Sequence, residues 1–246
     1  MNGVQGVAGS NPVAPTSFSP SPLPAETLIW MDDFSRPRRA MVEKLLRSPL
    51  VEPYEPAVES MLAVPRHLFV EKTLWHRAYT ECTLPIGRGQ TLSAPSVVLG
   101  CLSALRPSPG STVLEVGSGS GYVMALLSGI CGMACGVEKL LDLVHSSRRV
   151  LLGLGALGAR VRFGDGGLGW PEHAPFECIL LSAACPSVPA ALFDQLAEGG
   201  RLGAPVGEPA RQEFRVWRKV SGRVEDQGPA FSCTFVPLVR ELQPNG

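Results

Sequence analysis

The stretch that decides the fold is VLEVGSGSG at residues 113–121, in which an apolar run leads into three glycines at alternate positions. Glycine tolerates positive φ and lets a ligand approach the backbone closely. In α/β sheets a ligand lies across the carboxyl end of such a strand, where the chain turns into a helix. We therefore interpret one segment as a candidate cofactor-binding loop: Gly117, Ser118, Gly119, Ser120 and Gly121.

The spacing of these glycines argues against two common nucleotide sites. The dinucleotide fingerprint GxGxxG would place its third glycine at position 122, where this chain has Tyr122. The phosphate-binding pattern GxxxxGK[ST] does not occur in the sequence. A nicotinamide cofactor and P-loop chemistry are therefore disfavoured.

Two acidic residues follow the next predicted strands. Glu138 lies 21 positions after Gly117, where a carboxylate can accept hydrogen bonds from both hydroxyls of a ribose. Asp165, followed by Gly166, suits the amino group of an adenine. Other interpretations stay open: the glycine turn can serve packing alone, Glu138 can begin a helix, and Asp-Gly can be an ordinary turn. Together the residues favour an adenosine-bearing ligand.

The segments around the loop alternate between strand and helix patterns. The predicted strands cover 112–116, 133–137, 160–163, 178–182 and 201–206, and the predicted helices cover 94–105, 122–130, 140–152 and 189–196. This alternation is typical of a parallel sheet covered on both faces. The runs 214–220 and 231–236 have no helical pattern between them, which predicts a closing antiparallel hairpin.

The segment before the core has three parts. Residues 1–30 are rich in Pro, Ser and Gly, and we expect a disordered tail that is dispensable, precedes a functional start at Met31 or Met41, or binds a partner. Residues 36–47 and 55–63 predict amphipathic helices, and 65–93 predicts a long irregular loop of functional importance. Residues 31–246 thus form one predicted domain, with a helical cap at 36–93 and a cofactor-binding core at 94–246.

Charge and hydropathy disfavour several classes of protein. Lys and Arg total 22, as do Asp and Glu, so no basic excess exists to bind a nucleic-acid backbone. No apolar run reaches the length of a membrane span, and no basic residue precedes Arg36 as a secretory signal would require. We expect a cytoplasmic protein. It is expected to be a monomer, since no heptad run or apolar stripe is visible.

The cysteines predict neither disulfides nor a metal site. Seven cysteines occur, an odd number, and they form no CxxC pair. Cys131 and Cys135 are four residues apart but have no His or Cys partners at zinc-site spacing nearby. Reduced and mostly buried thiols are therefore expected.

Several further motifs carry a resemblance to a known family. They are Val64-Pro65-Arg66, Leu84–Gly87 with Gly89–Ser93, Gly164–Gly166, Pro205–Gly207 and Phe235–Leu238. With these motifs the chain resembles, over residues 64–238, the protein-L-isoaspartate (D-aspartate) O-methyltransferase family, which belongs to the S-adenosylmethionine-dependent methyltransferases. A glycine loop is shared by many methyltransferases, whereas 84–93 and 235–238 are specific to this family.

The resemblance implies a fold and an activity. The fold is α/β and Rossmann-like, with a mostly parallel seven-stranded sheet, an antiparallel hairpin at the carboxyl end and a helical N-terminal cap. The activity transfers a methyl group from S-adenosylmethionine to the carboxylate of isoaspartyl residues in damaged proteins, which initiates repair through a succinimide. The expected partners are proteins and peptides that contain isoaspartyl residues.

The same resemblance assigns roles to individual residues. Ser93 matches the family's catalytic serine, and Gln90, Thr91 and Leu92 match the segment that closes over the cofactor. The matches for the cofactor are the loop 117–121 around the methionine part, Glu138 for the ribose, and Asp165 with Gly166 for the adenine. Two positions depart from the family pattern, namely Glu81 in place of Asp and Ser96 in place of His or Tyr.

Alternative interpretations remain at this point. Ser93 precedes a predicted helix and can be its N-cap. A serine hydrolase is not supported, because GxSxG is absent and no histidine stands in a triad-like setting with Ser93. A methyltransferase of the same fold that acts on another carboxylate or a small molecule stays possible, as does a non-catalytic cofactor-binding adaptor.

Overall fold

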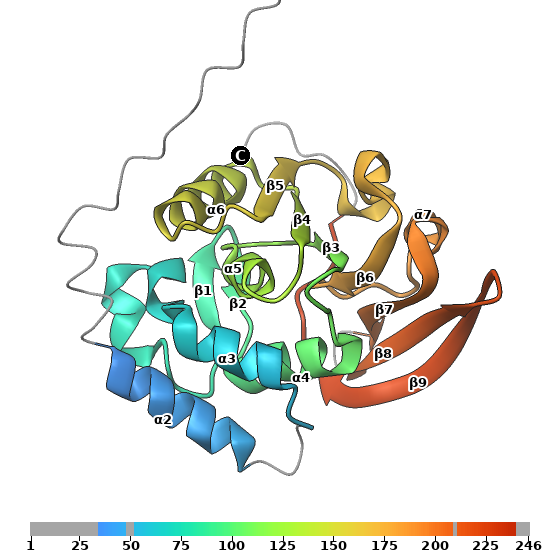
Figure 1. Ribbon diagram of the computed structural model, residues 1–246. Helices are drawn as coiled ribbons and strands as arrows, with labels where there is room; N and C mark the ends of the chain where they lie inside the picture. Colours follow the sequence, from blue (N-terminus) through green and yellow to red (C-terminus); the bar gives the residue numbers. More distant parts are fainter. Residues whose placement is uncertain (1–33, 48–51, 209–210, 240–246) are drawn as a thin grey trace, which may run out of the picture.

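The computed structural model describes residues 34–47, 52–208 and 211–239, and Figure 1 shows their arrangement around one large sheet. The sheet has seven strands in the order β5-β4-β3-β6-β7-β8-β9. The strands are β3 (Thr112–Val116), β4 (Met133–Glu138), β5 (Ala159–Phe163), β6 (Phe176–Leu181), β7 (Leu196–Glu208), β8 (Arg211–Val220) and β9 (Arg223–Cys233). Pairs from β5 to β7 are parallel, and β7-β8 and β8-β9 are antiparallel. The predicted fold class is confirmed.

Helices cover the sheet and form the amino-terminal cap. They are α2 (Ser35–Leu46), α3 (Glu55–Ala63), α4 (Pro95–Leu105), α5 (Tyr122–Ser128), α6 (Leu141–Gly153) and α7 (Ala190–Asp194), with 3-10 turns η1 (Arg66–Phe69), η2 (Lys72–Arg77), η3 (Gly166–Leu168) and η4 (Pro171–His173). The cap helices α2 and α3 pack on each other and on α4. In Figure 1 they lie on the side of the molecule opposite to the β8-β9 hairpin. The tail predicted at 1–30 lies outside the described residues.

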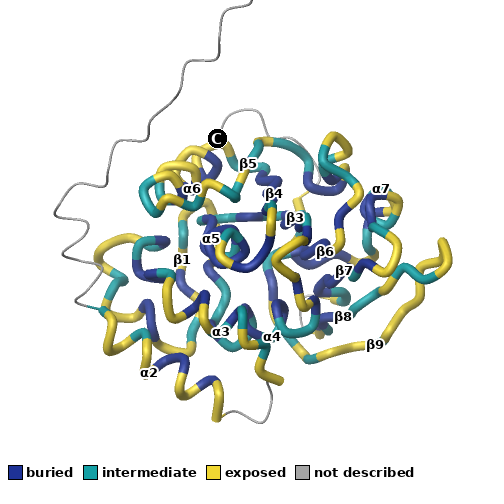
Figure 2. Tube along the Cα trace, viewed as in Figure 1, coloured by how far each residue is buried: buried dark blue, intermediate teal, exposed yellow. Residues whose placement is uncertain are grey.

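Side chains of the central strands alternate between two apolar cores, as the period of a strand requires. On one face, Leu114 of β3 packs with Ile179 of β6 and with Leu192 of α7. On the other face, Val113 and Leu180 join the core that the helices α2 to α6 cover. Figure 2 shows the central strands buried and the tip of the β8-β9 hairpin exposed. The carboxyl ends of β3 and β4 are thus held rigidly from both sides.

The segment 65–93 is more regular than its sequence predicts. It contains η1, η2 and a two-stranded antiparallel sheet of β1 (Leu84–Gly87) and β2 (Gln90–Leu92). Arg88 and Gly89 at the turn have φ values of 53° and 70°, which suit a tight hairpin. The prediction of an irregular loop here was wrong, because the glycines that suggested a break end β1 and form the turn of a hairpin.

Two predicted elements near the carboxyl end were misplaced. The last strand is β9 at 223–233 and not 231–236, because the polar residues 223–227 pair with β8 through their backbone. The helix predicted at 189–196 ends at Asp194, and Leu196 already begins β7. After β9 the chain returns to the sheet, where Ala184 N donates to Val236 O at 2.8 Å and Leu238 N donates to Ala184 O at 2.7 Å. This return places residues 236–239 beside the carboxyl end of the sheet.

Candidate active site

An open cleft of about 600 Å³ lies at the carboxyl ends of β3 and β4; we call it the main cleft. It is lined by hairpin β1-β2, the glycine loop, the turn after β4 and the returning segment 236–239, together with Gly166 and residues 182–183 after β6. Gln90, Thr91 and Gly119 are among the lining residues that the sequence predicted.

The glycine loop lies in close contact with its surroundings. Gly117 N donates to Val137 O at 2.8 Å, which fixes the loop against β4. Gly121 has φ 86°, and an added Cβ there would lie 2.9 Å from the Cβ of Ser147. Only glycine therefore lets α5 begin this close to α6, and the loop stays open toward the main cleft.

Glu138 is the last residue of β4, and its carboxylate faces the loop. Oε2 accepts a hydrogen bond from Gly119 N at 2.8 Å, and Oε1 accepts from Lys139 N and Leu140 N at 2.8 and 2.9 Å. The residue is 7% exposed and lines the main cleft. The alternative that Glu138 begins a helix was wrong, because α6 begins at Leu141. Because Oε1 already accepts two hydrogen bonds and Oε2 only one, Oε2 retains acceptor capacity for a ligand hydroxyl.

Of the two residues predicted to contact an adenine, only Gly166 lines the main cleft. Gly166 lines the cleft, and a Cβ there would lie 2.4 Å from Val116 Cγ1. Asp165 Oδ1 accepts a hydrogen bond from Gly167 N at 2.8 Å, as in an ordinary Asx turn. Asp165 is not among the residues that line the main cleft. Its contact with an adenine stays a prediction.

A second cavity adjoins the main cleft behind the glycine loop; we call it the Ser93 pocket. It spans about 340 Å³, including space open to solvent, and shares Ile86, Thr91, Gly117, Gly119 and Ser182 with the main cleft. The other predicted residues that line it are Leu92, Ser93, Ser118 and Ser120. The structure thus brings Ser93 next to the loop, although 24 residues separate Ser93 from Gly117.

Buried polar atoms without hydrogen-bond partners gather in the Ser93 pocket. Among the described residues they include Glu115 Oε2 and Ser118 Oγ. Buried polar atoms are normally paired, so such a group of unpaired atoms indicates that a polar ligand or water completes them. The donors and acceptors present fit a polar cofactor that extends from the main cleft into this pocket.

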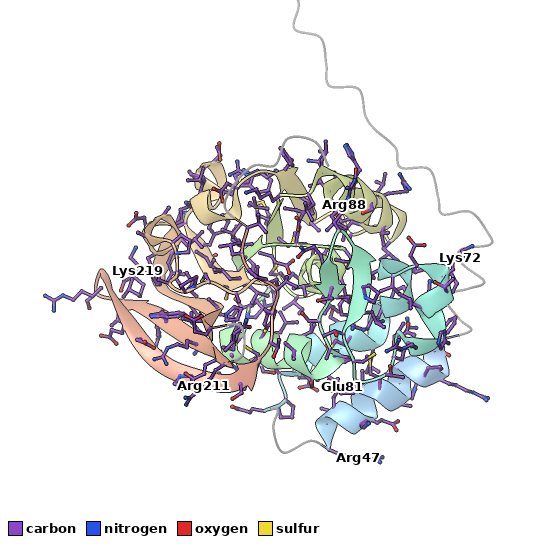
Figure 3. All side chains as sticks on the ribbon, turned by 180° about the vertical axis from the view of Figure 1, so that it is seen from behind. Arg47, Lys72, Glu81, Arg88, Arg211 and Lys219 are labelled. Atoms are coloured by element: carbon purple, nitrogen blue, oxygen red, sulfur yellow. The ribbon has the colours of Figure 1, made fainter. Side chains whose placement is uncertain are left out.

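Ser93 does not cap the helix that follows it. Helix α4 begins at Pro95, its N-cap is Ala94, and no side chain of the cap residue bonds to the helix. The N-cap interpretation was therefore wrong. Instead, Glu81, which is labelled in Figure 3, accepts hydrogen bonds at Oε1 from Ser96 N at 3.3 Å and from Ser96 Oγ at 2.5 Å. The negative charge of this carboxylate interacts favourably with the positive amino end of the dipole of helix α4.

Glu115 is a buried acid that the sequence analysis did not single out. It is 1% exposed, it accepts a 2.7 Å hydrogen bond from Ser182 Oγ, and burial raises its pKa to about 8 from an ordinary value of 4.5. Between pH 4.5 and about pH 8, Glu115 is therefore protonated in the folded protein and ionised in the unfolded chain. This contribution to stability is complete below about pH 4.5 and is lost as the pH rises toward 8.

We expect Glu115→Gln to remove this dependence, because an amide does not titrate. The slope that it removes is at most about 1.4 kcal/mol per pH unit in the free energy of unfolding. The melting temperature of the variant minus that of the wild type should increase from pH 5 to pH 8, measured without cofactor. If the melting temperatures of the two proteins change in parallel between pH 5 and pH 8, Glu115 is ionised in the folded state.

A sequence model of the family described as protein-L-isoaspartate(D-aspartate) O-methyltransferase (PCMT) matches residues 36–243. The chain belongs to this family. The protein-L-isoaspartate O-methyltransferase of Synechococcus sp. is 43% identical over 216 residues, covering 85% of this chain and 87% of the relative. That of Aeropyrum pernix is 41% identical over 244 residues, covering 94% of this chain and 93% of the relative.

Two solved structures have the same fold as this member of the isoaspartate methyltransferase family. A structure described as protein-L-isoaspartate O-methyltransferase has a TM-score of 0.75 at 24% identity and covers 83% of this chain and 67% of its own. A putative protein-L-isoaspartate O-methyltransferase from Plasmodium falciparum, in complex with S-adenosyl-L-homocysteine, has a TM-score of 0.70 at 24% identity and covers 83% and 99%. At these identities the likeness supports the fold alone.

Glu81 and Ser96, the two residues expected to depart from the family pattern, contact each other. Their sequence positions suggested separate changes, whereas in the structure they form one hydrogen-bonded pair at the start of α4. Ser182 lines both cavities and was not predicted from the sequence. Its signal was its position directly after β6, since the carboxyl ends of neighbouring parallel strands meet at one edge of the sheet.

The remaining sequence features concern metals, thiols and membranes. Five of the seven cysteines are buried, as expected. Burial raises the pKa of Cys131 and of Cys178 to about 12, so both remain thiols at neutral pH. In the described part of the chain, no group of three His, Cys, Asp or Glu side chains could hold a metal ion. None of the described helices has the length and apolar character of a membrane span.

Proposed function

We propose that this chain is a protein-L-isoaspartate O-methyltransferase. It transfers a methyl group from S-adenosylmethionine to the carboxylate of isoaspartyl residues in damaged proteins, and so initiates their repair through a succinimide. One observation carries this proposal: in a chain of this family, Ser93 lies in a pocket that adjoins the glycine loop and Glu138. S-adenosylmethionine, when bound, supplies a methyl group activated by a sulfonium.

The residues of the main cleft suit the three parts of this cofactor. Glu138 would accept hydrogen bonds from the ribose hydroxyls, and the loop 117–121 would hold the methionine part. Gly166 and Asp165 are proposed for the adenine end, and Gln90, Thr91 and Leu92 would close over the cofactor from hairpin β1-β2. Both Gln90 and Thr91 already line the main cleft, which supports this assignment.

Ser93 is proposed as the catalytic residue that orients the substrate carboxylate. A carboxylate with an ordinary pKa near 4 is ionised at neutral pH, so the reaction needs no general base. The protein must instead hold the attacking oxygen in line with the bond that breaks, about 3–3.5 Å from the methyl carbon. The Ser93 hydroxyl can donate a hydrogen bond to the carboxylate from a pocket with a rigid wall.

The remaining proposals concern the contacts with the substrate peptide, the domain organisation and the location of the protein. Residues 79–93 and the hairpin β8-β9 are proposed to contact the peptide backbone around the damaged residue. The cap at 36–93 and the core at 94–246 are proposed to form one domain after a tail at 1–30. We also propose a cytoplasmic monomer that does not bind nucleic acid.

The proposal predicts a sharp difference between two peptides of identical composition. With labelled S-adenosylmethionine, we expect methyl transfer to a short peptide in its isoaspartyl form and at least 100-fold less to its aspartyl form. The reason is that the isoaspartyl carboxylate stands one methylene nearer the backbone than a normal side chain would place it. Label on neither peptide, with cofactor binding confirmed by calorimetry, would instead support another acceptor or an adaptor.

A further inference from the structure

Arg66 is a fully buried cation at the start of η1. Its side chain donates from Nε to Ala78 O at 2.9 Å and from Nη2 to Ser93 O at 2.6 Å, and the residue is 0% exposed. In the part of the chain that the structure describes, no carboxylate lies within ion-pair distance of it. Burying an unpaired guanidinium is costly, and burial lowers the pKa of Arg66. The buried charge of Arg66 therefore needs a structural or functional explanation.

The guanidinium joins three segments that build the Ser93 pocket. Its Cζ lies 4.9 Å from the centroid of the Tyr122 ring, a cation–π contact. Tyr122 is the first residue of α5, directly after the glycine loop, and it lines the Ser93 pocket. Ala78 precedes the segment that leads into hairpin β1-β2. Arg66 therefore connects the start of the hairpin segment, the main chain of Ser93 and the end of the glycine loop.

Ser93 depends on such a connection. It lies between the end of β2 at Leu92 and the start of α4 at Pro95, and its side chain does not cap the helix. The position of its hydroxyl is therefore set by the main chain of a short connection. A displacement of 1 Å in a reacting group can reduce a rate by about 100-fold.

We propose that Arg66 is a positioning residue, which holds the Ser93 main chain at a fixed distance from the glycine loop so that the hydroxyl meets the substrate carboxylate beside the methyl donor. This inference rests on the proposed function. It assigns Arg66 no contact with substrate or cofactor, because Arg66 lines neither cavity. Its effect is expected in turnover, while cofactor affinity stays unchanged.

The test compares Arg66→Lys and Arg66→Met with a matched control. Lys keeps the charge but cannot serve both carbonyl groups in the same geometry, and Met keeps most of the volume but donates nothing. The control is Arg148→Met, which also removes a bond from a guanidinium to a backbone carbonyl, Arg148 Nε to Val161 O at 2.7 Å, on α6 away from Ser93. Circular dichroism sets a temperature at which every protein is folded.

Three constants are measured at this temperature: kcat and KM for an isoaspartyl peptide at saturating S-adenosylmethionine, and Kd for S-adenosylhomocysteine. We expect kcat to fall about tenfold in Arg66→Lys and further in Arg66→Met, with Kd within twofold of wild type. Arg148→Met should keep kcat within twofold. The expected result separates positioning from a loss of stability, which would reduce the amount of folded protein and leave the turnover of the folded enzyme intact.

Two results would overturn the inference. If Arg66→Lys keeps kcat within twofold, Ser93 does not depend on the guanidinium, whether or not Arg66→Met folds. If Kd rises in parallel with the fall in kcat, Arg66 shapes the cofactor site. The wild-type protein alone tests the proposed function, since an absence of methyl transfer by wild type to the isoaspartyl peptide refutes that function and not the role of Arg66.

Discussion

Ser93→Ala should lower kcat for an isoaspartyl peptide by at least 100-fold while Kd for S-adenosylhomocysteine stays within about twofold. The hydroxyl lines the pocket beside the glycine loop, and its loss removes the group that orients the carboxylate. The helix that follows should be undisturbed, because its N-cap is Ala94. Steady-state methyl transfer gives kcat, and isothermal calorimetry gives Kd.

The matched control for this variant is Ser103→Ala in α4, the helix that follows Ser93. Ser103 Oγ is buried without a hydrogen-bond partner and lies outside both cavities, so its removal should change kcat and Kd by less than twofold. If Ser93→Ala keeps full turnover, Ser93 has no part in the reaction. If Ser93→Ala loses cofactor affinity to the same extent, the serine belongs to the cofactor site.

Glu138→Ala should weaken the binding of S-adenosylhomocysteine about 100-fold. A hydrogen bond from a ribose hydroxyl to a carboxylate is worth about 1.5–3 kcal/mol, and 1.4 kcal/mol corresponds to a tenfold change in Kd. The substitution also frees Gly119 N from its acceptor, so the glycine loop loses an anchor. Calorimetric titration with S-adenosylhomocysteine measures the change.

Glu177→Ala is the control for Glu138→Ala. Glu177 Oε2 also accepts a hydrogen bond from a backbone amide, that of Thr112 at 2.6 Å, but at the amino end of the same sheet. Its loss should leave Kd unchanged while it removes a comparable backbone contact. An unchanged Kd in Glu138→Ala itself would mean that the ribose lies elsewhere.

Strong local patterns made part of the fold predictable. Strand β3 and helix α3 have the predicted bounds, 112–116 and 55–63, because an apolar run next to glycines and a proline in a first helical turn are decisive local signals. The hairpin β1-β2 was not predicted, and the closing strand was predicted at 231–236, which overlaps only the end of β9. Their glycines, proline and polar residues resemble a loop, and only pairing with neighbouring strands makes them regular.

The candidate site was predictable where chemistry is local to a motif. The glycine loop and Glu138 were located by spacing, and Ser93 by resemblance to a family. Arg66 was quoted there only as part of a motif, because nothing local shows that its guanidinium reaches a carbonyl 27 residues further along the chain. Asp165 shows the reverse limit, because it follows β5 as predicted but its Oδ1 accepts a hydrogen bond from Gly167 N.

The segment that returns to the sheet after β9 has a consequence for how this protein matures during synthesis. Val236, Leu238 and Val239 complete one wall of the main cleft, and Lys139 Nζ donates to Val239 O at 3.2 Å. The glycine loop and Glu138 leave the ribosome long before these residues are made. A nascent chain that already holds its central strands therefore still lacks this wall of the cofactor site. Methyl donor should bind tightly only after residues 236–239 have emerged, so repair activity begins with the finished sheet.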